Sequence, residues 1–189
     1  MALANYTDLQ TAIANWLARD GDSILTARIT DFIAMAEARI HYGSNGAMPS
    51  EPLRIRAMEN IATLSTVAGT ETVALPAGYV GMKRVKVVSS PNVSLQYLSP
   101  SMMDFEFPDS AQGKPTNYTI EGENLRLGKI PDAVYSLDML YYKKIDPLAT
   151  TSTNWLLTNY PNVYLYGALV EASPFLGDDQ RTVMWYGAF

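Results

Sequence analysis

Few residues in this chain combine side-chain type and spacing in a way that could carry out a reaction. His41 is the only histidine, and it has neither a nucleophile nor an orienting carboxylate beside it in the sequence, so a role as a polar helix cap is expected. Glu171, Asp178 and Asp179 fall near one helix face, an arrangement that acid–base catalysis or metal binding could use. Carboxylates at helical spacing are more often solvated or paired with a cation, here Arg181. These residues therefore predict no catalytic or metal site.

A nucleotide site is not indicated either. Gly113-Lys114 is similar to the end of a phosphate-binding loop, but no glycine stands five residues earlier. Pro115 occupies the position where Ser or Thr would hold magnesium. The chain has no cysteine, which excludes thiolate nucleophiles, disulfides and cysteine-based zinc sites. We expect a protein that is not an enzyme and needs no cofactor.

One concentration of basic residues lies in the middle of the chain. Residues 52–100 carry five cations against Glu59 and Glu71, a local charge of +3. A single-stranded nucleic-acid site would pair such a patch with exposed aromatics on neighbouring strands, and only Tyr79 and Tyr97 stand nearby. Alternation along the predicted strands favours an exposed face that contacts an acidic neighbour, such as an adjacent identical subunit. The candidate contact residues are Arg54, Arg56, Lys83, Arg84 and Lys86.

The composition describes a lightly charged globular chain. Its 189 residues are 48% hydrophobic and only 17% charged, with a net charge of −5. That length suffices for one sizeable core, and the small charged fraction suits a protein with much surface buried in an assembly. A negative balance argues against affinity for a phosphate backbone. No secretory signal or membrane-spanning run is visible, so no membrane partner is expected.

Apolar spacing predicts two N-terminal helices that form a hairpin. Thr7 and Gln10 suggest a capping box for the first helix, which Asp20-Gly21-Asp22 ends. The second helix ends at Gly43-Ser44-Asn45-Gly46. Each helix carries one apolar stripe, and both stripes need a third helix to cover them. We expect one core that includes Trp16, Phe32 and Ile33 with Leu165 and Leu169; the stripes are residues 9, 13, 16 and 17 and residues 25, 29, 32, 33, 36 and 40.

From Leu53 the apolar period changes to two, which predicts strands. Residues 53–58 alternate, and Gly69-Thr70 is expected to turn a hairpin between the segments on either side. A single helical turn is expected at 100–107. Short strands at this spacing are typical of a small antiparallel sandwich or barrel; the further candidates are residues 82–88, 93–98, 118–121, 125–127 and 133–144.

Helix returns in the last third of the chain, at 153–157 and again from Pro161, with Pro174 expected to kink or divide it. The predicted class is α+β: an N-terminal helical hairpin and C-terminal helices form a bundle, with the small β-sandwich or barrel lobe inserted. The helical lobe is expected at 1–48 plus 151–189 and the β lobe at 52–150. The candidate helix-packing residues are Tyr164, Tyr166, Trp185 and Tyr186.

Short motifs occur in a definite order along nearly the whole chain. The opening helices contribute Tyr6-Thr7-Asp8-Leu9 with Ile13 and Trp16, then Ala36-Glu37-Ala38-Arg39-Ile40. The closing helices contribute Trp155-Leu156 and the block from Tyr164-Leu165-Tyr166 through Asp178-Asp179 to Trp185. The strand region contributes Leu75-Pro76, Gly78-Tyr79, Gly113-Lys114-Pro115, Tyr118, Leu125-Arg126-Leu127 and Tyr141-Tyr142-Lys143. In this order the motifs resemble the head–tail adaptor proteins of tailed phages. The resemblance makes the tail a second candidate neighbour, besides an adjacent subunit, for the basic residues named above.

This resemblance implies a structural virion protein that forms a ring, usually of twelve subunits, beneath the portal. Such a ring connects the capsid to the tail or to a nozzle protein, and it lines the passage for the DNA. The ring contacts the DNA only non-specifically, while the DNA passes through. The implied location is the phage neck, and the host cytoplasm during assembly, with the four C-terminal aromatics as candidates for the portal side. Members commonly continue into an arm that grips the portal, whereas this sequence ends at Phe189.

Two other functions remain open at this point. A tail-completion or tail-tube subunit would differ from a neck adaptor in ring stoichiometry and in its neighbours. A small-molecule or glycan-binding β module, the more distant alternative, would need a concave aromatic site in the sandwich.

Overall fold

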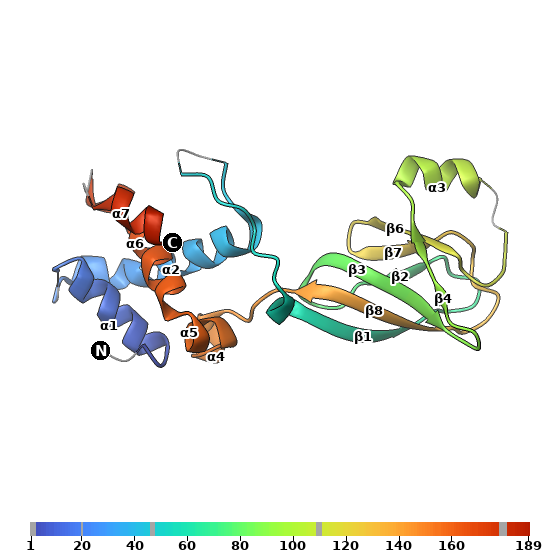
Figure 1. The fold of residues 1–189 in the computed structure, drawn as a ribbon, viewed down its shortest axis with the longest axis horizontal. Coiled ribbons are helices and arrows are strands. Elements are labelled where there is room, and N and C mark those ends of the chain that lie inside the picture. The colour runs from blue at the N-terminus through green and yellow to red at the C-terminus, as the bar shows by residue number, and fades with distance from the viewer. Residues whose placement is uncertain (1–2, 20, 46–47, 109–110, 178–180) are drawn as a thin grey trace. The chain divides into compact units, whose positions relative to one another are not determined.

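The computed structural model describes residues 3–19, 21–45, 48–108, 111–177 and 181–189. The chain divides into two compact units (Figure 1). Residues 1–54 and 145–189 form the helical unit, and residues 55–144 form the β unit. The N-terminal helices pack with the C-terminal helices, and two four-stranded sheets make up the middle of the chain. The predicted α+β class is confirmed.

Side-chain caps fix where the two N-terminal helices begin. Asn5, not Thr7, caps α1 (Tyr6–Trp16): its Oδ1 accepts from the Asp8 amide at 3.0 Å, and its Nδ2 donates to the Asp8 carboxylate at 3.0 Å. The Asp22 carboxylate caps α2 (Ser23–Tyr42) by accepting from the amides of Ile24 and Leu25. These backbone hydrogen bonds, chiefly the one from Leu25, lower the pKa of Asp22.

The C-terminal helices supply the third surface that the sequence predicted. They are α4 (Leu148–Thr151), α5 (Trp155–Asn159), α6 (Pro161–Leu176) and α7 (Thr182–Ala188). Helix α6 packs on α1, α2, α5 and α7. Gly167 permits the close approach to α2, because a Cβ there would lie 3.2 Å from the Ala36 methyl and 2.9 Å from the Phe189 ring.

Most of the predicted helical core is buried. Phe32, Ile33, Leu165 and Leu169 are all inside the helical unit, as is the whole predicted stripe of α2. Trp16 is the exception, since it remains 46% exposed. Leu17, four residues after Ile13, takes the inward position, and Trp16 lies edge-on to Tyr166 with ring centroids 5.6 Å apart.

Pro174 does not divide the final helical region at its own position, so that part of the prediction is wrong. Pro174 lies inside α6, which continues to Leu176 and ends before Gly177, whose φ is 69°. Because Pro174 falls in the last turn, its missing amide removes a hydrogen bond only near the helix end. The Ser173 hydroxyl donates to the Leu169 carbonyl and accepts from Thr182 at 2.8 Å, which ties α6 to α7.

The β unit is a sandwich of two sheets with strand orders β1-β8-β3-β4 and β2-β7-β6-β5. One helix, α3 (Pro100–Glu106), packs on β6. The strands are β1 (Glu59–Ser65), β2 (Thr72–Ala74), β3 (Tyr79–Val88), β4 (Val93–Ser94), β5 (Gln96–Tyr97), β6 (Asn117–Glu121), β7 (Asn124–Leu127) and β8 (Ser136–Lys143).

The inward faces of the two sheets form one apolar core. Strands β4 and β5 belong to different sheets, so the segment predicted as one strand at 93–98 crosses between them at Leu95, itself buried. This crossing fastens the sheets together at one corner of the sandwich. The fully buried members of the core are Val85, Val87, Leu95, Tyr118, Leu125, Leu127, Leu137, Met139 and Tyr141.

Three local strand predictions are wrong. The segments beside Gly69 do not pair with each other, because β1 pairs with β8 and β2 with β7. The sandwich is not wholly antiparallel, since β5 and β6 run parallel. Residues 53–58 are not a strand: the Leu53 amide donates to the Ile40 carbonyl of α2, and Arg56–Met58 is a 3-10 turn, η1, before β1 begins.

Candidate interaction surfaces

Two β-bulges decide where the basic side chains of β3 point. Between Met82 and Arg84, strand β3 advances two residues while β8 advances one, which leaves Lys83 as the extra residue. A second register shift lies between Tyr79 and Gly81. Val85 and Val87 are buried in the core, so Arg84 and Lys86 point outward. The bulge adds Lys83 to the same outer face, where strict alternation would have turned it inward.

This outer face carries two ion pairs and one exposed arginine. Lys83 pairs with Glu59, and that hydrogen bond raises the pKa of Lys83. The Lys86 ammonium lies 2.9 Å from the Asp138 carboxylate. Arg84 is exposed, and no ion pair to it occurs among the described residues. The face therefore retains a positive charge at Arg84.

Of the five predicted basic residues, Lys83, Arg84 and Lys86 share one strand face, whereas Arg54 and Arg56 lie outside the sheet. Arg54 belongs to the helical unit, where it donates to the carbonyls of His41 at 3.1 Å and Leu53 at 2.7 Å. Arg56 is exposed in η1. The alternation at 53–58 is real in the sequence, but the segment is held by α2 and by its own turn rather than by a partner strand.

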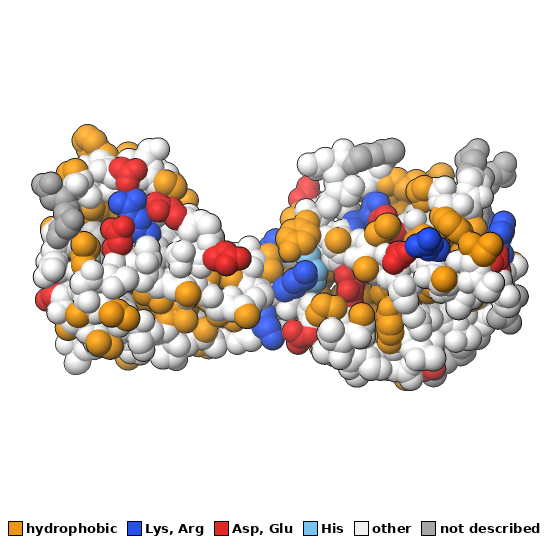
Figure 2. Space-filling view, turned by 180° about the vertical axis from the view of Figure 1, so that it is seen from behind, with side chains coloured by type: hydrophobic (Ala, Val, Ile, Leu, Met, Phe, Trp, Pro, Cys, Tyr) orange, Lys and Arg blue, Asp and Glu red, His pale blue; other side chains and the backbone are white. Residues whose placement is uncertain are grey.

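A second charged surface, which sequence reasoning missed, lies on the outer face of the other sheet beside α3. Arg126 of β7 is 2.7 Å from Asp104 of α3, 3.0 Å from Glu121 and 3.7 Å from Glu71. The hydrogen bonds that the guanidinium donates to Asp104 and Glu121, chiefly the one to Asp104, raise the pKa of Arg126. Figure 2 shows such a group on the β unit, blue atoms bordered by red. Three carboxylates around one guanidinium leave an excess of negative charge.

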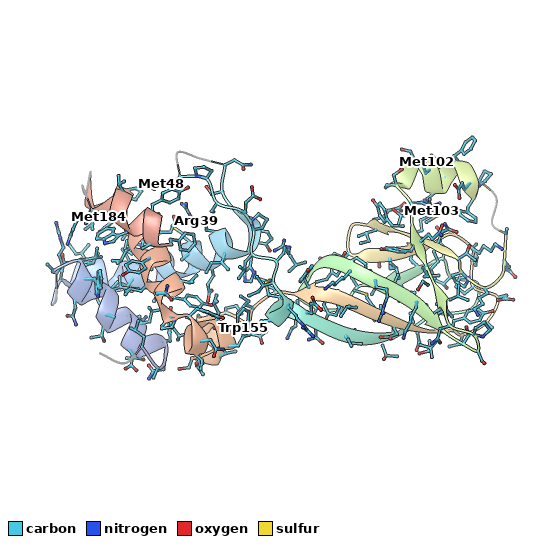
Figure 3. All side chains as sticks on the ribbon, in the orientation of Figure 1. Arg39, Met48, Met102, Met103, Trp155 and Met184 are labelled. Carbon is cyan, nitrogen blue, oxygen red and sulfur yellow. The ribbon has the colours of Figure 1, made fainter. Side chains whose placement is uncertain are left out.

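Helix α3 adds apolar side chains to this acidic surface. Met103 is fully buried against the sheet, whereas Met102 is 45% exposed and Phe105 78% exposed. Figure 3 shows Met103 pointing toward the strands and Met102 away from them. The sequence contained a signal for this surface: a helix this short needs one apolar residue, Met103, to contact the sheet, and Met102 and Phe105 are additional.

The four predicted C-terminal aromatics all make contacts within the helical unit. Tyr164 is buried, its hydroxyl accepts from Asn154 Nδ2 at 2.8 Å, and burial raises its pKa. Trp185 is buried beneath the Arg181 guanidinium, 5.0 Å from the ring centroid. Tyr166 is half-buried against Trp16, and the Tyr186 hydroxyl donates to the Pro49 carbonyl.

Two of the residues that could have suggested acid–base chemistry, Glu171 and His41, lie within the described part of the helical unit. Glu171 pairs with Arg39 at 2.5 Å rather than with Arg181, and Arg39 also donates to the Met48 carbonyl at 2.9 Å (Figure 3). His41 is buried at the end of α2 rather than an exposed cap. Asp178 and Asp179 lie outside the described residues. Within the described ranges, no group of three His, Asp or Glu side chains is placed to hold a metal ion.

A hollow of about 390 Å³ in the β unit, lined by residues 74–79 and 122–124, bears on the alternative of a binding module. Tyr79 is the only aromatic side chain among the described residues that line it. Tyr79 stacks on Tyr141, with ring centroids 6.0 Å apart. The hollow offers no pair of aromatic rings for a sugar.

A protein-family model described as SU10 adaptor protein matches residues 4–189. This chain belongs to the SU10 adaptor protein family. The match covers both units, and it confirms the resemblance to phage head–tail adaptors. No match to the sequence was found among curated proteins.

Membership in the SU10 adaptor protein family makes this chain a structural adaptor of a phage. Its surfaces are therefore to be judged as contacts with other virion proteins rather than as reaction centres. No helix in the described part of the chain is long and apolar enough to cross a membrane.

Proposed function

We propose that this SU10-family adaptor assembles as a ring at the neck of the virion, between the portal and the tail or nozzle protein. The ring surrounds the path of the DNA and has, by the family pattern, twelve copies. The family match across residues 4–189 is the observation that carries the proposal.

The distribution of charge supports this function. The helical unit has five Lys and Arg against ten Asp and Glu, so it holds the whole net charge of −5. The β unit has nine of each and is neutral. An acidic adaptor does not bind the phosphate backbone tightly, and that lets DNA pass.

The test is to prevent synthesis of this protein in the phage that encodes it and to examine the particles by electron microscopy. We expect DNA-filled or emptied heads without tails, and normal particles when the gene is supplied in trans. Averaged images of the restored particles give the number of copies and the neighbours on each side. Particles with complete necks in the absence of the protein would contradict the proposal, whereas density within the tail would favour a tail-completion or tail-tube subunit.

A further inference from the structure

One outer face of the β unit combines positive charge with two apolar side chains, the exposed Ile61 and the half-buried Leu140. Ile61 of β1, Leu140 of β8 and Arg84 of β3 are aligned in one row across the sheet by the strand register. Ile61 is 63% exposed. Lys83 and Lys86 lie on either side of Arg84 along β3. We call Ile61, Lys83, Arg84, Lys86 and Leu140 the strand face.

The opposite outer face combines negative charge with exposed apolar side chains. Met102 and Phe105 project from α3, which also carries Asp104 and the exposed Glu106. Glu71 and Glu121 extend the acidic surface around Arg126. We call Met102, Asp104, Phe105, Glu106, Glu71 and Glu121 the α3 face.

The two faces are complementary in kind and cannot meet within one molecule. They are the outer surfaces of two sheets whose inner surfaces share one core, so they point away from each other. The α3 face has an exposed Phe beside carboxylates, and the strand face has an aliphatic row beside an arginine. Contact between the two faces would remove apolar side chains from water and bring opposite charges together, and both effects stabilise association. One copy can therefore offer both faces to two different neighbours at once.

We propose that adjacent copies of this chain dock through these faces, with the strand face of one copy against the α3 face of the next. This inference rests on the proposed ring and names the contact that builds it. A contact between two different patches is heterologous, and repetition of it gives a closed ring when the rotation closes. Phe105 and the row of Ile61 and Leu140 form its apolar centre, and Arg84 with Glu106 lie among its charges.

The same observations argue against a nucleic acid as the occupant of the strand face. Two of its three cations are already paired with Glu59 and Asp138, so one uncompensated arginine remains. Tyr142, which lies 5.9 Å below the Lys83 ammonium, is half-buried and not free to stack on bases.

Charge reversal on each face gives a direct test with purified full-length chain. Arg84→Glu places like charges across the contact, as does Glu106→Lys, so each variant alone should associate about tenfold more weakly or worse. A mixture of the two variants restores opposite charges when they alternate around the ring. One contact then joins the two altered faces, Glu at position 84 against Lys at position 106, and the next contact joins the two unaltered faces. Sedimentation velocity over a wide concentration range measures assembly of the wild type, each variant and the mixture.

The expected result is loss of assembly in each variant and recovery in the mixture. Matched controls are Arg28→Glu and Glu51→Lys, which make the same changes in net charge on the helical unit and should assemble like the wild type. Phe105→Ala should also weaken assembly. Circular dichroism should show an intact fold in this variant, because the phenyl side chain of Phe105 is mostly exposed.

Assembly of both single variants at the wild-type level would overturn this contact and leave the proposed ring standing. Failure of the mixture to recover, with both variants folded, would overturn the pairing of the two faces. A wild-type chain that stays monomeric over the whole concentration range would also overturn self-docking through these faces. The proposed function is decided separately, by the particles made without the protein.

Discussion

The two units of this adaptor place their charges differently. In the helical unit the best-formed ion pair, Arg39 with Glu171, is largely enclosed, with 14% and 16% of the two side chains exposed. In the β unit the ion pairs lie on the outer faces of the sheets, around Arg84 and around Arg126. The helical unit also has two exposed ion pairs, Arg19–Asp22 and Arg28–Asp31, but only this unit uses an enclosed pair, among the described residues, to join two of its helices. The units are thus suited to different tasks.

The largest expected effect tests whether the two cores are independent. Leu169 of α6 and Met139 of β8 are both fully buried, one in each unit. Leu169→Ala and Met139→Ala should each cost about 2–5 kcal/mol through lost apolar contact and a residual cavity. Hydrogen exchange measured by mass spectrometry should show lost protection in the altered unit alone.

Val183→Ala on α7 is the control, since Val183 is largely exposed and its truncation should change stability by no more than about 0.5 kcal/mol. If either core variant removed protection equally from both units, the comparison would fail, because the chain would then unfold as one cooperative body.

A smaller effect should distinguish the enclosed ion pair from a surface one. Glu171→Gln deprives the enclosed Arg39 of its charged partner, which should cost about 1–3 kcal/mol. Asp138→Asn removes the partner of Lys86 on the outer sheet face, where solvent screens the pair, and should cost about 0–1 kcal/mol. Urea denaturation of both variants measures the difference. Equal losses would mean that the two units use their ion pairs alike.

The smallest effect is the contribution of one tyrosine to the pH dependence of the β unit. Burial raises the pKa of Tyr79 to about 12, from an ordinary value near 10. Because the folded state favours the protonated phenol, this contribution is complete below pH 10 and is lost as pH rises toward 12. Tyr79→Phe should flatten the fall in β-unit stability over that interval, as measured by urea denaturation at several pH values. An unchanged slope in the variant would assign the pH dependence to other groups.

Helices were predictable from local pattern because their contacts repeat along one face. The α2 stripe from Leu25 to Ile40 is buried as expected, and Pro161 begins α6. Strand pairing was not predictable in the same way, because a partner can come from any distance along the chain. Gly69 does sit in a turn, with φ of 79°, but the strands on either side of it pair with β8 and β7 instead.

The surfaces were predictable only in part, for a related reason. Alternation correctly placed Arg84 and Lys86 on one strand face. Lys83 joins them through a bulge that no local pattern signals, and Arg54 is withdrawn by hydrogen bonds to the end of α2. The acidic surface near α3 was missed because its members come from four separate segments. Asp104, Glu71, Glu121 and Arg126 become neighbours only when the sheet forms.

The way in which the chain enters and leaves the β unit has an evolutionary consequence. Strand β1, the first of the unit, pairs with β8, the last, so that Glu59 lies opposite Tyr142. Residues 55–144 thus begin and end at neighbouring points, as an inserted cassette does. A different sheet with closely spaced ends could replace this one by recombination at two adjacent junctions. Related adaptors can in this way acquire new neighbours while they inherit the same helices.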